Sequence, residues 1–339
     1  MNNIQFESSK KENNGLAIKD TIGKLTKRFG SLLGLIILCI LLTIASGQFL
    51  TFTNIMNIAR QSSISILTSI GMLLVILTAG IDNSIGSVLS FSTCVMGIAI
   101  IKWGINPIIG MIICLLCGAS FGFLNGILLT KLRLPHPFIS TLGTKNIARG
   151  LALVITAASP ISGFPASVQF LGGYSIGSIP MSLFLVIIVA VGFSIFLNKT
   201  AQGRYIYAVG GNKVVANLSG INVTKTLIIC YTLSGTLAAL AGIVLTGRVN
   251  SAFPLSGLDY ELDGIAACII GGASFMGGSG TVGGTIIGAL IMAILRNGLN
   301  LLGVSADYQS VAIGIVIVGA VYVDVLRREA EKKVKTQAA

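Results

Sequence analysis

The sequence predicts an all-α integral membrane protein with about ten transmembrane helices. Of its 339 residues, 53% are hydrophobic and only 10% are charged, whereas about 25% of residues are charged in soluble domains. The charged residues are also grouped, which leaves charge-free stretches long enough for helices of about 20 residues, the length that crosses a hydrocarbon layer of about 30 Å. These stretches are 29–59, 61–81, 83–101, 103–130, 150–198 and 264–295.

The basic residues predict which side of the membrane each loop occupies. Lysine and arginine are concentrated in cytoplasmic loops, and 17 of the 23 lie on one side if both ends of the chain are cytoplasmic. We therefore expect cytoplasmic tails at 1–29 and 327–339 and a membrane domain at 30–326. The net charge of +12 does not indicate nucleic acid, because the cations are scattered between apolar runs.

The apolar runs, divided at turn residues, give the expected helices in order. Proline and glycine between Ser159 and Pro180 break the long fifth run into two spans joined by an outer loop. The apolar part of the eighth span, 265–274, is too short to cross unaided, so a re-entrant segment is the alternative there. The expected spans are 30–47, 57–80, 84–101, 107–129, 137–157, 180–198, 225–247, 260–276, 282–302 and 308–325.

Glycine spacing predicts close helix packing and an internal repeat. Glycines at four-residue spacing let a neighbouring backbone approach closely. One such ridge falls on the third helix of spans 2–5 and one on the third helix of spans 7–10. The single sixth span would give these sets opposite orientation, as in an inverted repeat, although small residues also recur in membrane helices without a repeat. The ridges are Gly118, Gly122 and Gly126, and Gly280, Gly284 and Gly288.

No pattern typical of an enzyme or a metal site is present. The GxGxxG match at 278–283 lies between spans, not after a buried strand, and no GxxxxGK[ST] motif occurs. His136 is the only histidine. Cys114 and Cys117 lie in an apolar run without a second ligand pair. We therefore expect no catalysis, cofactor or metal in this chain, and ATP hydrolysis by another polypeptide.

The loop before the seventh span contains a predicted short helix with an apolar face. Asn212 can cap its start, and Gly220 can close it in the left-handed conformation. Val214, Val215 and Leu218 fall on one face. Two turns do not persist alone in water, so this face packs either in a pocket of a partner protein or on the inner surface of the protein itself.

Polar residues within the spans mark a possible solute path. Asp82, Asn83 and Ser84 lie at the junction of the second and third spans, where a broken helix could place its N-terminus near the path. Capping of the third span is the alternative. Lys145 and Arg149 lie four residues apart on one face of the fifth span and are too costly to expose to lipid.

Acidic residues open the eighth span on the predicted outer side. Asp259, Glu261 and Asp263 would favour the partial positive charge of a helix N-terminus. Together with Arg248, they could also recognise a docked protein by charge complementarity. The sequence leaves both interpretations open.

Six motifs in order closely resemble the ribose-type monosaccharide permeases of ATP-binding-cassette (ABC) importers. They are TAGIDNSIGS at 78–87, PFISTLGT at 137–144, GRYIYAVGGN at 203–212, LSGINV at 218–223, YELDGIAA at 260–267 and NGLNLLG at 297–303. The resemblance covers about residues 30–326 and implies a type II importer permease in the bacterial cytoplasmic membrane. Its implied partners are a second copy, a cytoplasmic ATPase that holds ATP and Mg²⁺, and an extracytoplasmic sugar-binding protein.

The resemblance also assigns roles to residues. It implies that the loop 199–224 contains the coupling helix, which docks in a cleft of the ATPase. Because sugars carry no charge for the membrane cations to balance, Phe138 and Thr141 are the expected solute neighbours. The coupling residues are Asn212, Val214, Val215, Ala216, Leu218 and Gly220.

Departures from the family pattern leave the sugar open. Ala79 and Asn83 replace residues of a motif that usually reads GIDLSVGS after a further glycine. The segment 159–164 is similar to galactose and methylgalactoside permeases, whereas 300–304 is closer to the ribose branch. A permease of the same family for nucleosides or another small solute is an alternative.

An ion-coupled secondary transporter is the rival class. Asp82, Lys145, Arg149 and Arg296 would then be the candidate intramembrane relay. Transport by this chain alone, without ATP, would favour that interpretation.

Overall fold

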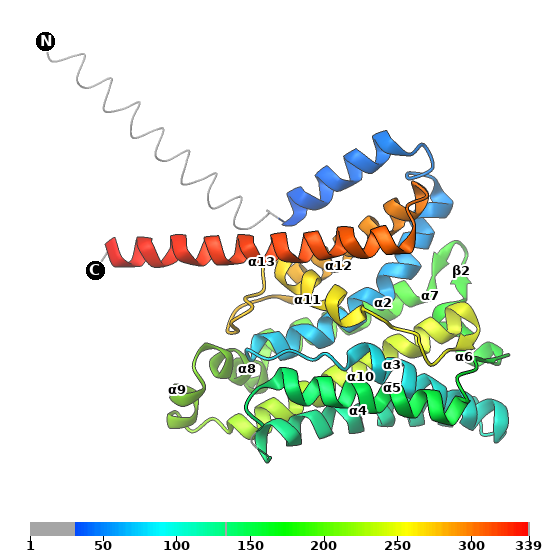
Figure 1. Cartoon of the computed structure of the whole chain (residues 1–339), viewed down its shortest axis with the longest axis horizontal. Coiled ribbons are helices and arrows are strands. Elements are labelled where there is room, and N and C mark those ends of the chain that lie inside the picture. Colours follow the sequence, from blue (N-terminus) through cyan, green and yellow to red (C-terminus); the bar gives the residue numbers. More distant parts are fainter. Residues whose placement is uncertain (1–30, 133, 338–339) are drawn as a thin grey trace, which may run out of the picture.

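Helices make up almost all of the computed structural model, which describes residues 31–132 and 134–337 (Figure 1). The expected tail at 1–29 lies outside the described residues. The helices are Ser31–Ala45, α2 (Phe52–Leu77), α3 (Ile85–Gly97) continued by the π-helical η1 (Ile98–Lys102), α4 (Pro107–Thr130), α5 (Pro137–Thr156), α6 (Ala166–Gly172), α7 (Met181–Lys199), α8 (Ala201–Gly211), α9 (Lys213–Leu218), α10 (Val223–Val249), α11 (Tyr260–Ile270), α12 (Val282–Leu301) and α13 (Ala306–Gln337).

Six of the described helices are long and apolar enough to cross a bilayer: α2, α3 with η1, α4, α7, α10 and α12. This confirms a multi-pass helical membrane protein, while the count of ten crossings stays a prediction. The helix α5 is also 20 residues long but carries Lys145 and Arg149. The helix α11 has 11 residues and is therefore about 16 Å long, too short to cross alone.

The loop expected between the fifth and sixth spans is present and is tied to the end of α10, while its position on the outer side stays a prediction. Strand β1 (Ile161–Ser162) pairs with β4 (Ser251–Ala252), and β2 (Ser175–Ile176) pairs with β3 (Ile179–Pro180). Asn250 follows α10 in the left-handed conformation, and its Oδ1 accepts a hydrogen bond from the Phe164 amide at 2.9 Å.

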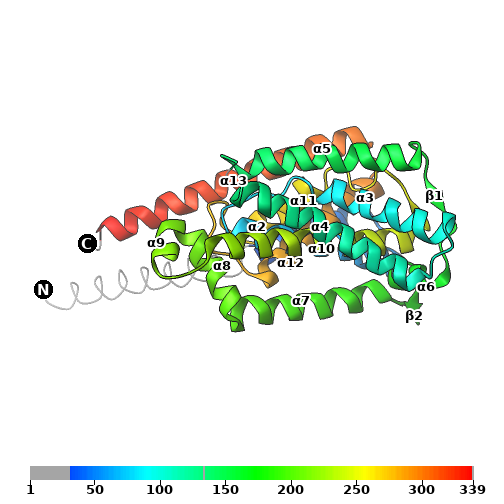
Figure 2. The same ribbon diagram turned by 90° about the horizontal axis from the view of Figure 1, so that it is seen from below.

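The core is built around α2, which is the most buried of the long helices. It packs against α10, α11 and α12, and α10 packs against α4 on its other side. In Figure 2, α5 lies along one edge of the molecule and α7 along the opposite edge, with α2, α10 and α12 between them. Because few apolar side chains of α4 and α7 are buried within the protein, these helices are suited to contact lipid.

The glycine ridges lie at the closest helix contacts. A Cβ added at Gly118, Gly122 or Gly126 of α4 would overlap atoms of α10. One at Gly288 of α12 would overlap the backbone of α11, and one at Gly284 would overlap Gly271 at the end of α11. Both ridges therefore allow a neighbouring backbone to approach, as their spacing predicts.

One expectation for the second ridge is wrong. Gly280 lies in the turn before α12 begins, with a φ of 156°. The turn that contains it connects α12 to the ends of two other helices: the Gly278 amide donates to the Leu77 carbonyl at 2.9 Å, and the Tyr207 hydroxyl donates to the Gly280 carbonyl at 2.8 Å. The GxGxxG match thus belongs to a helix-packing turn.

The close contact between α4 and α10 gives a stability prediction. A methyl group at Gly122 would overlap the Tyr231 carbonyl, and overpacking of this kind costs about 1–3 kcal/mol. We expect Gly122→Ala to lower the thermal unfolding midpoint of the detergent-purified protein. In the control Gly192→Ala on α7, nothing lies within 4 Å of the new methyl group, so its midpoint should match the wild type. Equal midpoints for the two variants would contradict the packing.

Two helices, α3 and α11, begin near the middle of the molecule (Figure 1). The segment 78–84 leads from α2 back to α3, and the segment 250–259 leads from α10 back to α11 (Figure 1). The first turns of α3 and α11 touch, because a Cβ on Gly86 would overlap the Gly257 carbonyl. The contacts are reciprocal, since α3 packs on α10 and α11 packs on α2.

Candidate functional site

The predicted short helix is present as α9, with the predicted caps. The Asn212 side chain accepts hydrogen bonds from the amides of Val214 and Val215 at 2.9 and 3.1 Å. Gly220 follows the helix with a φ of 81°. In Figure 1, α8 and α9 lie at the same end of the molecule as the end of α13.

One side of α9 is anchored and the other is bare. Ala216 is buried against Val209 of α8 and Leu227 of α10. Val214, Val215 and Leu218 are exposed, the last at 81% of its surface. A contiguous apolar face of this kind is typical of a protein interaction site.

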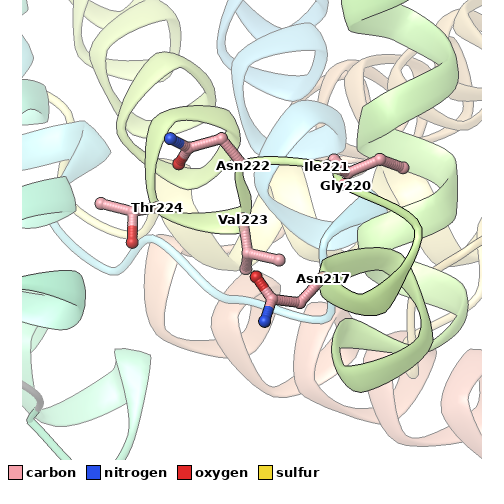
Figure 3. Close-up of a pocket in the computed structure, with 6 residues that line it drawn as sticks. All are labelled: Asn217, Gly220, Ile221, Asn222, Val223 and Thr224. Atoms are coloured by element: carbon pink, nitrogen blue, oxygen red, sulfur yellow. The ribbon is translucent and has the colours of Figure 1, made fainter.

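A hollow lies beside α9, at the turn that leads into α10 (Figure 3). Its volume is about 340 Å³. Amide and hydroxyl side chains line it together with apolar ones. The lining residues are Asn217, Gly220, Ile221, Asn222, Val223 and Thr224.

Asp82 lies at the broken helix before α3 and is fully enclosed by hydrogen-bond donors. Its Oδ1 accepts from the Ser84 amide at 3.0 Å and from the Ser84 hydroxyl at 2.6 Å, and its Oδ2 accepts from the Ser234 hydroxyl of α10 at 2.8 Å. Asn83 is also buried, and its amide nitrogen has no partner among the described residues. The carboxylate closes a turn before α3, while the side chain of Ser84 does not cap that helix.

The hydrogen bonds at Asp82 continue into α4 and α5. The Asn125 amide donates to the Ser84 hydroxyl at 2.9 Å, and the Thr144 hydroxyl donates to Asn125 Oδ1 at 2.6 Å. Asn125, Thr144 and Ser234 were not among the site residues predicted from the sequence. Asn125 carried a usable signal, because an amide in a charge-free apolar span is costly unless it is paired.

The two cations of α5 hold the segment that leads into α11. Lys145 forms an ion pair with Glu261. Arg149 donates to the Ser256 carbonyl and to the Ser90 hydroxyl, each at 3.0 Å, and also to the Pro254 carbonyl. Neither cation pairs with Asp82 within the described part of the chain, so the candidate ion relay is not continuous there.

Arg296 of α12 forms a two-bond ion pair with Asp263. Its Nε and Nη2 donate to the two carboxylate oxygens at 2.9 and 2.8 Å. The carboxylate side chains of Asp263 and Glu261 are 6% and 3% exposed. The structure thus places these two acids in internal ion pairs, whereas the sequence left open whether they stabilise a helix start or contact a docked protein.

The other two residues predicted to contact a docked protein, Asp259 and Arg248, are exposed. Asp259 immediately precedes α11 with a φ of 64°. Arg248, in the last turn of α10, lines a hollow of about 330 Å³ together with Phe170 and Tyr174 of the outer loop. The two aromatic rings stack with their centroids 5.3 Å apart. Arg248 is therefore the member of the set that is best placed for an outer contact.

The expected solute neighbours on α5 differ in exposure. Phe138 is exposed, whereas Thr141 is buried and donates to the Pro137 carbonyl at 3.0 Å. Lys145 is 30% exposed on the same helix. The exposed side of α5 therefore presents an aromatic ring and a cation.

Comparison with known proteins identifies the family. The family model described as "Branched-chain amino acid transport system / permease component" matches residues 54–321. The ribose import permease RbsC of Bacillus subtilis (strain 168) is 45% identical over 88% of this chain and 92% of its own length. RbsC of Escherichia coli (strain K12) is 42% identical over 87% and 92%.

A permease for a different sugar is also similar. The D-allose transport system permease AlsC of Escherichia coli (strain K12) is 41% identical over 85% of this chain and 88% of its own length. No solved structure matches the chain. Permeases of ABC importers are not themselves enzymes and work with an ATPase and a binding protein. The chain therefore belongs to this permease family and is the membrane subunit of an ABC sugar importer.

Proposed function

We propose that this chain forms the translocation path of an importer for ribose or a closely related monosaccharide in the bacterial cytoplasmic membrane. The observation that carries the choice of sugar is the identity of 45% and 42% with two ribose import permeases over almost the whole chain. A galactose and methyl galactoside import permease of Salmonella typhimurium is 35% identical, so ribose comes before galactose.

The ATPase would dock on α9. Its apolar face is exposed at one end of the molecule, outside the long apolar helices, while Ala216 fixes the helix to α8 and α10. A partner that covers Val214, Val215 and Leu218 would gain the hydrophobic contribution of three side chains. Movement of that partner would act on α9 and α10 together.

The topology that we propose has ten membrane segments in two inverted four-helix sets, with α3 and α11 as broken helices. The reciprocal packing of α3 on α10 and of α11 on α2 supports the repeat. The position of α9 at the same end as the end of α13 supports a cytoplasmic C-terminus (Figure 1). The cytoplasmic tails would be 1–29 and 327–339.

The path would run along the side of the molecule that α5 and α13 share, opposite α7 (Figure 2). A second copy of the chain would close it. Phe138 is exposed on α5, and Lys145 and Arg149 of the same helix are half-buried. The broken-helix segment that contains Asp82, Asn83 and Ser84 packs behind that helix. The aromatic ring can stack on a sugar, and the cations can donate to its hydroxyl groups. On the outer side, Arg248 would contact the sugar-binding protein.

Reconstitution tests this function. The permease is placed in proteoliposomes with the ATPase of the same importer, and the sugar-binding protein is added with radiolabelled D-ribose. We expect uptake that requires both ATP and the binding protein, with allose and galactose as weaker competitors. Uptake by the permease alone, driven by a sodium or proton gradient without ATP, would instead support the ion-coupled alternative.

A further inference from the structure

A directional chain of hydrogen bonds crosses the interior of this protein from α5 to α10. Thr144 donates to Asn125, Asn125 donates to Ser84, Ser84 donates to Asp82, and Ser234 donates to the second oxygen of Asp82. The distances are 2.6, 2.9, 2.6 and 2.8 Å in that order. Each of the five side chains that form these hydrogen bonds is at most 1% exposed.

The order of donors and acceptors in this chain is fixed by its chemistry. A carboxylate only accepts, so Ser84 must use its proton on Asp82 and can only accept from Asn125. The amide of Asn125 is then left with its oxygen facing Thr144. Asn125 joins the two sides of the chain, because it donates to Ser84 before α3 and accepts from Thr144 of α5. A buried polar network of this kind is costly to break, because a group that loses its partner inside the protein is left unpaired.

One end of the hydrogen-bond chain lies near the coupling segment, which is the loop 199–224 that contains α8 and α9. Ala216 of α9 packs on Leu227 in α10, and Ser234 lies about two turns further along that helix. Gly210 of α8 sits so close to the Leu77 carbonyl that a Cβ would overlap it, and Leu77 ends the helix before Asp82. The coupling segment therefore contacts the elements on both sides of the bond between Ser234 and Asp82.

The other end of the hydrogen-bond chain lies on α5. Thr144 is followed directly by Lys145, whose ammonium pairs with Glu261 in the first turn of α11. A displacement of Thr144 would therefore shift the helix that holds the start of α11 and presents Phe138 on its exposed side.

We propose that this chain of hydrogen bonds transmits the movement of the coupling segment to α5. Asn125 is the positioning residue that joins the α10 end of the hydrogen-bond chain to its α5 end. The inference rests on the proposed function, because it presumes that a docked ATPase moves α9. The hydrogen-bond chain ties the segment 78–84, between α2 and α3, to α4, α5 and α10. A shift of α10 relative to α2 must therefore either move Thr144 or break a buried hydrogen bond.

Four single variants test the hydrogen-bond chain. Thr144→Val removes the donated proton at nearly constant volume, whereas Thr144→Ser keeps it. Thr68→Val is the matched control, because Thr68 is equally buried in α2 but donates only to carbonyls of its own helix, those of Ile64 and Ser65. Asn125→Leu removes both bonds of the central residue.

The measured quantity is the number of D-ribose molecules taken up per ATP hydrolysed, in proteoliposomes that contain the permease and ATPase with added binding protein. Each substitution leaves a buried polar partner unpaired, so we expect Thr144→Val and Asn125→Leu to lower this ratio about tenfold, with the ATPase still recovered. Thr144→Ser and Thr68→Val should keep the wild-type ratio. The double variant that combines Thr144→Val with Asn125→Leu should lose no more than Asn125→Leu alone, because both substitutions break the same link.

Four outcomes would overturn the inference. A wild-type ratio in Thr144→Val would show that the chain does not transmit movement. An equal loss in Thr68→Val, or additive losses in the double variant, would assign the effect to general destabilisation. Wild-type vesicles that hydrolyse ATP but take up no D-ribose would overturn the proposed sugar first, and the inference as stated with it.

Discussion

Replacing Leu218 with glutamate is expected to abolish recovery of the ATPase with the purified permease. Leu218 is the most exposed apolar residue of α9, and it shares one face with Val214 and Val215. A partner that covers this face would have to bury the new carboxylate without a compensating charge, and central interface positions carry about 2 kcal/mol or more of binding free energy. The affinity should therefore fall at least about thirtyfold, with transport lost in parallel.

The control for this experiment adds the same charge elsewhere at the same end of the molecule. Ala201 is exposed at the first position of α8, where a negative charge favours the helix N-terminus. Ala201→Glu should leave ATPase recovery unchanged. Both variants should reach the membrane in wild-type amounts, because neither position is buried. Undiminished recovery with Leu218→Glu would count against α9 as the docking site.

The structure of α9 shows which features could be predicted from the sequence. The cap at Asn212 and the left-handed glycine at Gly220 act within a few residues, so the local pattern is sufficient to place them. The apolar face follows from helical periodicity alone. Whether that face is free or packed on the protein depends on the rest of the fold, and the structure shows Ala216 packed and Leu218 bare.

The ion pairs could not be predicted from spacing. Lys145 and Glu261 are 116 residues apart, and Arg296 and Asp263 are 33 apart on different helices. The sequence indicated that the cations need partners and that the acids lie near a helix start. It did not show that the helix start is folded into the interior, which brings the two groups together.

The broken helix at α11 explains why the sequence left two interpretations open for the eighth span. Hydropathy detects a continuous apolar run, so it finds α2, α10 and α12 readily. The helix α11 is short and begins inside the molecule after an extended segment, and its acidic first turn resembles an exposed loop in the sequence. The glycines of α12 pointed to this neighbour only indirectly, because spacing reveals a close contact but not which helix makes it.

Breaking the pair between Arg296 and Asp263 is expected to have the largest effect on stability. Arg296→Met leaves the Asp263 carboxylate unpaired at 6% exposure, and the loss of one partner from a buried pair costs about 3–5 kcal/mol. We expect a large decrease in the thermal unfolding midpoint of the detergent-purified protein. Asp263→Leu should be less harmful, because the longer arginine is 26% exposed and can extend toward water.

The double variant separates charge balance from position. Arg296→Met with Asp263→Leu removes both charges and fills the site with apolar groups of similar size, an exchange that is often neutral or stabilising. We expect its unfolding midpoint to return close to the wild-type value. A double variant as unstable as Arg296→Met would show that the pair contributes through packing and not through its charges.

Transport by that double variant then tests what the pair does beyond stability. The two parallel hydrogen bonds fix the first turn of α11 against α12 in one orientation, and two apolar side chains impose no such orientation. We therefore expect a permease that is stable and recovers the ATPase but takes up the sugar more slowly. Wild-type uptake would mean that burial of α11 alone holds it in place, and that the ion pair serves only to neutralise two charges inside the membrane.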